Sequence, residues 1–138
     1  MYLWMTVLKE EWKMTFETKK IMDKNIEVHA NCARIPVFVC HSEYVNIETT
    51  KAFEIDEVRE ILKKAEGVGV VDMHADEGYI TPVEVAGEDK VYVSRLRQDK
   101  TVPHGLSFWC VGDNLRKGAA LNAVQIAEVL VQKYLPKK

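Results

Sequence analysis

The chain has 138 residues, of which 47% are hydrophobic and 29% are charged. This length fits one domain, the composition excludes collagen-like, disordered and coiled-coil proteins, and no apolar run approaches the roughly 18 residues of a membrane span. Nineteen Lys and Arg against 21 Asp and Glu give a formal net charge of -2. We therefore expect one domain over residues 1–138, with neither a nucleic acid nor a membrane as partner.

The cysteine content argues for a reducing compartment. Three cysteines without C-x-x-C spacing fit neither a disulfide framework nor a zinc site. The first residues also lack the basic leader and the small-residue cleavage site of a secretory signal peptide. We therefore expect a cytoplasmic protein without a metal centre. Its thiols are expected to be reduced and mostly buried at Cys32, Cys40 and Cys110.

The first part of the chain begins with a helical pattern over residues 7–23, in which apolar side chains recur at i, i+4 spacing. Residues 28–39 are predicted to be extended, because Pro36 excludes a helix interior and the three residues after it are β-branched or aromatic. Polar and apolar residues then alternate over 44–49. That alternation predicts a half-buried strand.

Helical periodicity returns over residues 56–65, and Gly67 follows where a C-terminal cap would lie. A last helix is predicted over residues 118–134, ending before Pro136. This order of elements predicts an α+β fold, with a mixed or antiparallel sheet and helices packed mainly on one face. The strands of the second part are predicted at residues 68–71, 91–97 and 106–111.

The single glycine-rich stretch is Gly67-Val68-Gly69. A dinucleotide fingerprint follows a strand and opens a helix, whereas this stretch follows a predicted helix and precedes a predicted strand. Position 72 is Asp, so the third glycine of that fingerprint is missing. We interpret the stretch as a helix-to-strand turn.

Among the four histidines, His41 is the candidate for chemistry, since it follows an apolar run and precedes a polar pair. Arg34 lies seven residues earlier, and in extended chain an odd separation places two side chains on opposite faces unless a bend intervenes. The residues alone leave the role of His41 open. Cys40 faces away from its neighbour, so a Cys–His nucleophile pair is not expected. Polar or turn contexts favour solvent exposure for His29, His74 and His104.

Seven blocks of sequence, in this order, carry a family likeness: Glu10–Met14, Glu17–Ile21, Cys32–Val37, His41–Glu43, Tyr92–Arg97, Gly105–Trp109 and Asp113–Glu128. Together they resemble aspartate-β-semialdehyde dehydrogenase, over about residues 9–130. The resemblance covers only the C-terminal part of that family, its substrate-binding and dimerisation domain. It implies the C-terminal domain of the fold that semialdehyde dehydrogenases share with glyceraldehyde-3-phosphate dehydrogenase.

The resemblance also implies a reaction, the NADP-dependent interconversion of aspartyl phosphate and aspartate semialdehyde. This reaction belongs to the biosynthesis of lysine, threonine and methionine. Arg34 matches the arginine that binds the substrate carboxylate, and His41 matches the catalytic acid and base. Glu10 matches the residue that binds the substrate ammonium, Lys13 the phosphate-binding lysine, and Asn114 a position that contacts NADP.

Several of these residues also have a purely structural interpretation. Glu10 and Lys13, three residues apart on a predicted helix, also fit an ordinary solvated ion pair. Arg34 also fits a sheet-edge arginine, and Asn114 a turn residue before a helix. Arg95 and Arg97, two apart on a predicted strand, are expected to share a face and to be available for a subunit contact.

The sequence departs from the family in several places. The catalytic cysteine and the N-terminal NADP-binding domain of the family are not within these 138 residues, and residues 1–8 do not match the family. Cys32 matches a non-catalytic cysteine, and Cys40 stands where the family usually has a small residue. We expect the chain alone to be inactive, because residues that act as one catalytic unit fail together.

Two roles follow for such a chain. It is half of a split enzyme, complemented by a separate chain that carries the NADP-binding half, or it is a non-catalytic dimerisation or small amino-acid-binding module. We expect a homodimer, with strands 91–97 and 106–111 as candidates for an interface of at least about 1,000 Å². We expect a small-molecule substrate to bind Arg34 and Glu10 with millimolar affinity at best, because water screens both charges.

Overall fold

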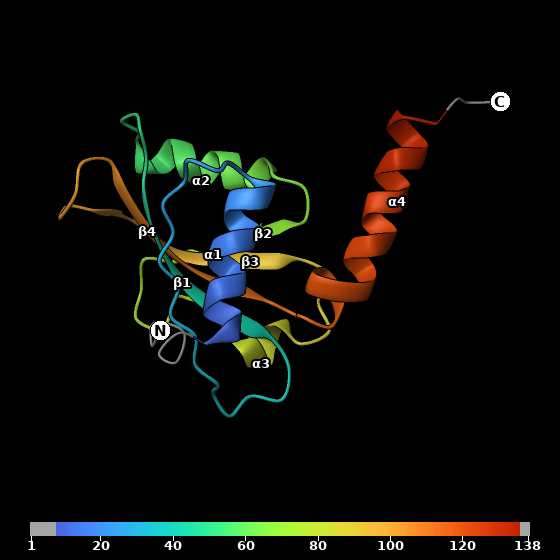
Figure 1. Ribbon diagram of the computed structural model, residues 1–138. Helices are drawn as coiled ribbons and strands as arrows, with labels where there is room; N and C mark the ends of the chain where they lie inside the picture. The colour runs from blue at the N-terminus through green and yellow to red at the C-terminus, as the bar shows by residue number, and fades with distance from the viewer. Residues whose placement is uncertain (1–7, 136–138) are drawn as a thin grey trace. The chain divides into compact units, whose positions relative to one another are not determined.

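A computed structural model describes residues 8–135 (Figure 1). The chain divides into two compact units, Met1–Pro36 and Val37–Lys138, and each is described by itself. The helices and strands confirm most of the predicted elements.

The first unit contains one helix, α1 (Lys9–Ile21), which confirms the helix predicted over 7–23 with somewhat tighter limits. Acidic residues occupy its first turn and lysines its last, as the helix dipole favours. After α1, the backbone N–H of Cys32 donates to the carboxylate of Glu11 at 2.8 Å. Residues 28–39, predicted to be extended, pair with no strand within the described residues.

The second unit is built on a four-stranded mixed sheet in the order β1-β4-β3-β2. β4 is antiparallel to both of its neighbours, and β2 is parallel to β3. The mixed sheet confirms the predicted α+β class. The strands are β1 (His41–Glu48), β2 (Val68–Val70), β3 (Val91–Asp99) and β4 (Gly105–Gly112).

One face of the sheet packs against α2 (Ile55–Lys64), the helix predicted over 56–65. Its apolar side chains lie against a buried cluster of strand residues, because they recur along one face of the helix. Arg59 on the same helix forms an ion pair with Asp72, after β2. The buried cluster consists of Val93, Leu96 and Leu106, with Ile55, Val58 and Leu62 packed against it.

The other face of the sheet carries a second buried cluster, since neighbouring strand residues point to opposite faces. Val111 and Cys40 are buried there together with Val85 of α3 (Pro82–Val85), and Tyr92 and Trp109 pack against them. The sequence analysis did not predict α3, because four residues are too few to show a helical period.

The C-terminal segment is interrupted. A helix was predicted over residues 118–134, but the structure has a π-helical turn, η2 (Arg116–Ala120), followed by α4 (Leu121–Lys133). Ala119 leaves helical geometry, with φ -144° and ψ -111°. α4 has no buried residue, and apolar Val124 and Ile126 are about half exposed. Among the described helices, none is long and apolar enough to cross a membrane.

Two valines of α3 provide a matched test of the core on its side of the sheet. Val85 has no exposed surface, whereas Val83 is 86% exposed. Val85→Ala should lower the free energy of unfolding by about 1–3 kcal/mol, through lost burial and the cavity left behind. Val83→Ala should change it by less than about 0.5 kcal/mol. Urea unfolding of both variants measures the difference, and equal values would contradict the assigned core.

Candidate functional site

In the first unit, two candidate residues form an ion pair one turn apart on α1. The ammonium of Lys13 donates to the carboxylate of Glu10 at 2.8 Å, and about half of each side chain is exposed. The hydrogen bond to Glu10 raises the pKa of Lys13. The structure therefore brings Glu10 and Lys13 together as the spacing predicted, in a position open to a ligand.

The carboxylate of Glu11 ties the segment that carries Arg34 to the start of α1. It accepts hydrogen bonds from the backbone N–H groups of Leu8 and Cys32, both at 2.8 Å. The hydrogen bond from Cys32, followed by that from Leu8, lowers the pKa of Glu11. Arg34 lies two residues beyond this anchor. Its side chain is exposed and forms no hydrogen bond or ion pair within the part of the chain that the structure describes.

In the second unit, His41 is the first residue of β1 and its side chain is exposed. Its position follows from Cys40, whose φ of +82° turns the chain sharply into the strand. The backbone N–H of Cys40 donates to the side-chain oxygen of Asn114 at 2.9 Å. The structure therefore brings Asn114 beside the peptide that precedes His41.

The thiols beside the candidate site are poorly suited to be nucleophiles. The Sγ of Cys40 lies 3.4 Å from the carbonyl oxygen of Pro82, and burial raises the pKa of this thiol. Burial also raises the pKa of Cys110, to about 11. Since the thiolate is the reactive form, both cysteines act as packing residues. Neither replaces the catalytic cysteine of the family.

Asp113 fixes the position of Asn114. Its buried carboxylate accepts hydrogen bonds from the backbone N–H groups of Gly87 at 2.8 Å and Leu115 at 2.9 Å. The hydrogen bond from Gly87 is the main cause of the lowered pKa of Asp113. The sequence analysis missed this residue and the left-handed backbone of Cys40. The small residue usual at position 40 of the family was the one available signal.

The described residues offer little that would hold a dinucleotide. Gly67, with φ +76°, ends the turn after α2, and Val68 begins β2, which confirms the helix-to-strand turn. No strand–glycine loop–helix unit occurs in residues 8–135. The oxygen of Asn114 is already bonded to Cys40, so its amide NH₂ alone is left for a ligand. These residues do not form an NADP site on their own.

No metal site is indicated either. Within residues 8–135, no group of three or more His, Cys, Asp or Glu side chains is arranged to hold a metal ion.

Comparison with known proteins gives a consistent result. Residues 5–117 match the family model described as "Semialdehyde dehydrogenase, dimerisation domain". The aspartate-semialdehyde dehydrogenase of Aquifex aeolicus is 53% identical over 128 residues, which are 92% of this chain and 38% of that protein. The relative from Rickettsia bellii is 48% identical over 126 residues, 91% of this chain and 37% of that protein. The chain therefore spans less than two-fifths of the length of these relatives.

A solved structure has the same fold. The aspartate semialdehyde dehydrogenase II of Vibrio cholerae, complexed with ASA, superposes with a TM-score of 0.84 at 43% identity. The match covers 92% of this chain and 38% of that one.

The backbone of Cys40 supports a matched pair of substitutions. Cys40→Gly and Cys40→Ala both remove the thiol, but only glycine adopts φ +82° without strain. The glycine variant should be more stable than the alanine variant by about 1 kcal/mol. Urea unfolding of the two variants measures this difference. A more stable alanine variant would show that position 40 does not hold a left-handed backbone.

Asp113 predicts a pH dependence of stability. Its pKa is lowered in the folded state, so its contribution is complete above its unfolded pKa of about 3.9 and is lost as pH falls through the folded pKa. Asp113→Asn should destabilise the protein at neutral pH, and the gap to wild type should narrow below about pH 4. Unfolding free energies measured across this range test it. A gap that is constant with pH would contradict the assignment.

Proposed function

Because the chain belongs to the semialdehyde dehydrogenase family, through its dimerisation domain, we propose that it forms the C-terminal, substrate-binding part of an aspartate-semialdehyde dehydrogenase. The observation that carries this proposal is the 53% identity with the Aquifex aeolicus enzyme over 128 residues. The proposed activity is the interconversion of aspartyl phosphate and aspartate semialdehyde. It requires the part of the relatives that this sequence does not span. In this proposal that part carries the thiolate nucleophile and binds the NADP that exchanges hydride with the substrate.

Each candidate residue has a role that suits its chemistry. Arg34 presents a planar guanidinium with no partner among the described residues, which suits a bidentate bond to the substrate carboxylate. His41 moves the proton of the nucleophile, since a neutral imidazole has one nitrogen that accepts a proton and one that donates a hydrogen bond. Glu10 binds the substrate ammonium and Lys13 the phosphate.

The ion pair between Glu10 and Lys13 favours these two roles. Solvent screens the pair, so its two groups separate at little cost when a ligand arrives. An ammonium then bonds to the carboxylate and a phosphate to the lysine, which preserves charge balance at both groups. The pair therefore holds both side chains in place before the ligand binds.

Asn114 has a positioning role in this proposal. Its bond to the N–H of Cys40 sets the backbone that carries His41, and its free amide NH₂ faces no partner among the described residues. A contact with NADP through that NH₂ is compatible with this bond. It would add a single hydrogen bond to a cofactor held by other residues.

We also propose that the chain assembles as a homodimer through its sheet. The family that it matches is a dimerisation domain. β3 and β4 are the two inner strands, so their faces are the surfaces that we expect in an interface, although β2 covers the edge of β3 only at Val91–Val93. The thiols of Cys40 and Cys110 form no disulfide within the described residues, which supports a cytoplasmic location.

Reconstitution tests the activity. The 138-residue chain is mixed with a chain that carries the N-terminal part of the Aquifex aeolicus relative, and phosphate-dependent reduction of NADP with aspartate semialdehyde is measured. Neither chain alone should be active. In the mixture His41→Asn should lower kcat by at least about 100-fold, because general acid–base catalysis contributes that much. His29→Asn, which changes an exposed histidine without an assigned role, should have little effect.

Failure of the mixture under conditions in which both chains fold and associate would favour the non-catalytic dimerisation or amino-acid-binding module. Turnover by the 138-residue chain alone would also overturn the proposal, and would require another nucleophile.

Arg34 gives a second test in the reconstituted enzyme. Arg34→Ala should raise KM for the semialdehyde and lower kcat/KM by at least about tenfold, since a hydrogen bond to a charged group contributes 1.5–3 kcal/mol. Arg34→Lys should recover only part of this loss, because lysine cannot form the bidentate fork. Full recovery by lysine would show that Arg34 acts only as a point charge.

A further inference from the structure

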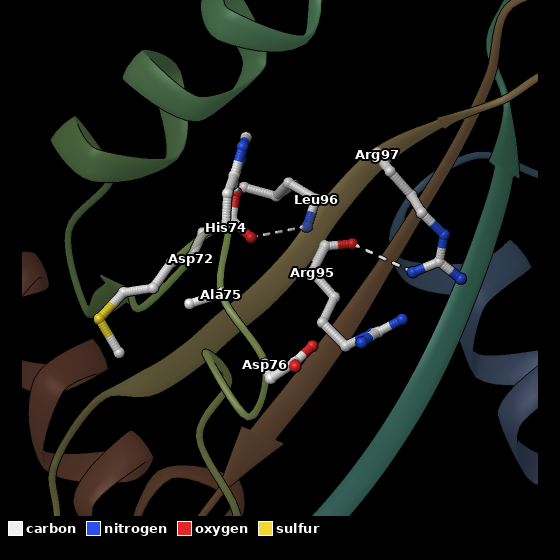
Figure 2. A pocket seen from close by; sticks show the side chains of 8 residues that line it. Asp72, His74, Ala75, Asp76, Arg95, Leu96 and Arg97 are labelled. Carbon is white, nitrogen blue, oxygen red and sulfur yellow. Dashed lines mark hydrogen bonds and ion pairs between the residues drawn. The ribbon is translucent and has the colours of Figure 1, made fainter.

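A pocket of about 580 Å³ lies between the loop that follows β2 and the bulged half of β3 (Figure 2). Its lining residues all belong to the second unit, and none of them belongs to the proposed substrate site, although Arg95, Leu96 and Arg97 lie on β3, a strand of the proposed dimer interface. The volume is within the range of small-molecule sites. The charged side chains around this pocket therefore need a separate explanation.

The back of the pocket is fixed by Asp72, whose side chain is only 5% exposed. One carboxylate oxygen accepts hydrogen bonds from Nε and Nη2 of Arg59, at 3.0 and 2.9 Å. The other oxygen accepts the backbone N–H of Leu96 at 3.2 Å. His74 lies 3.2 Å from Nη2 of Arg59. These groups bind one another and form a preorganised wall.

Two arginines on β3 form no ion pair within the described residues, although Arg97 donates to the backbone carbonyl of Arg95 at 3.5 Å and interacts electrostatically with Asp99. A register shift between Ser94 and Arg97 marks a β-bulge, and Arg95 within it has a φ of +56°. The guanidinium of Arg95 lies 5.8 Å from the ring centroid of Tyr79, and that of Arg97 lies 5.1 Å from the centroid of Tyr44. Neither forms an ion pair within the described residues. The aromatic rings orient both cations without neutralising them.

The backbone at Arg95 strengthens this observation. An arginine in the left-handed region is strained, and such residues persist where the surrounding structure requires them, often at binding sites. Bulges commonly redirect a side chain toward a functional site. Here the bulge separates Arg95 from Arg97, and both side chains still line the same pocket (Figure 2).

The remaining charged group is Asp76, in the loop opposite β3. Its carboxylate is exposed and forms no hydrogen bond or ion pair within residues 8–135. The pocket therefore presents two guanidiniums and one carboxylate that form no ion pair within the described residues, with Asp99 acting on Arg97 at longer range. This set is the complement of a molecule with two carboxylates and one ammonium.

We propose that this pocket binds an acidic α-amino acid of the aspartate or glutamate type. Arg95 and Arg97 each bind one carboxylate through charge-assisted hydrogen bonds, and Asp76 binds the ammonium. A dicarboxylate without an amino group leaves Asp76 facing like charge, and a neutral amino acid leaves one guanidinium unpaired. The proposal uses none of Glu10, Lys13, Arg34 and His41, and it requires that the proposed dimer leave the bulged half of β3 accessible to the ligand.

Calorimetry on the 138-residue chain tests the proposal, with L-aspartate and L-glutamate as ligands and succinate and inorganic phosphate as comparisons. Both amino acids should bind more tightly than succinate or phosphate. Arg97→Ala and Arg95→Gly should each weaken amino-acid binding by at least about tenfold. Glycine at position 95 also relieves the positive φ, so this variant should fold at least as well as the native chain.

Three further variants separate the possible sites of amino-acid binding. Lys100→Ala removes an exposed positive charge outside the pocket and should leave affinity unchanged. Arg34→Ala removes the proposed substrate site, so any aspartate binding that this variant loses belongs to that site, and binding in the pocket should remain. Asp76→Asn should weaken binding of the amino acids while strengthening that of succinate.

Several results would overturn the proposal. These are unchanged amino-acid affinity in Arg95→Gly and Arg97→Ala, equal affinity for aspartate and succinate, or loss of binding in Arg34→Ala alone, which would place the ligand at the substrate site. A change in self-association in Arg97→Ala, with amino-acid affinity unchanged, would instead make this surface a contact between two copies of the chain.

Discussion

The buried carboxylate of Asp113 is the contact on which the candidate site of the second unit depends. It accepts hydrogen bonds from Gly87 after α3 and from Leu115 before η2, so it fixes the turn at the end of β4 against a segment that lies 26 residues earlier in the chain. Its neighbour Asn114 then holds the backbone N–H of Cys40. An ionised, almost fully buried group is stable there because backbone N–H groups replace the water that it loses. These contacts therefore position His41, the residue that follows Cys40.

The helices and strands of this protein were predictable to the extent that their residues repeat. α1, α2 and the four strands follow from apolar periodicity and from runs of β-branched residues. α3 is too short to show a period, and the π-turn before α4 lies in a sequence that also suits a regular helix. Residues 28–39 have the composition of a strand but find no strand partner among the described residues. Residue composition limits the backbone conformations that a segment can adopt, but hydrogen bonding to a second strand decides whether the segment becomes part of a sheet.

Some contacts of the candidate site were also predictable from the sequence, and others were not. The contact between Glu10 and Lys13 is local and follows from helical spacing. The contact between Asn114 and Cys40 joins residues that are 74 positions apart in the chain, and the type of neither residue predicts it. Arg95 is not a residue that usually adopts positive φ, so its bulge was not visible in the sequence. The family resemblance suggested the candidate site residues, and the structure shows the contacts that position some of them.

The register of the sheet also has a consequence for how the protein folds. β3 and β4 are joined by a short connection and can form a hairpin early, whereas β1, which ends at Glu48, pairs with β4, which begins at Gly105, across 56 intervening residues. Loop closure of that length is slow, because its entropy is lost before its contacts form. His41 begins β1, so it comes beside the Asp113–Asn114 turn only when this last strand docks. We therefore expect the candidate acid–base residue to reach its position late in folding, after β3 and β4 have paired.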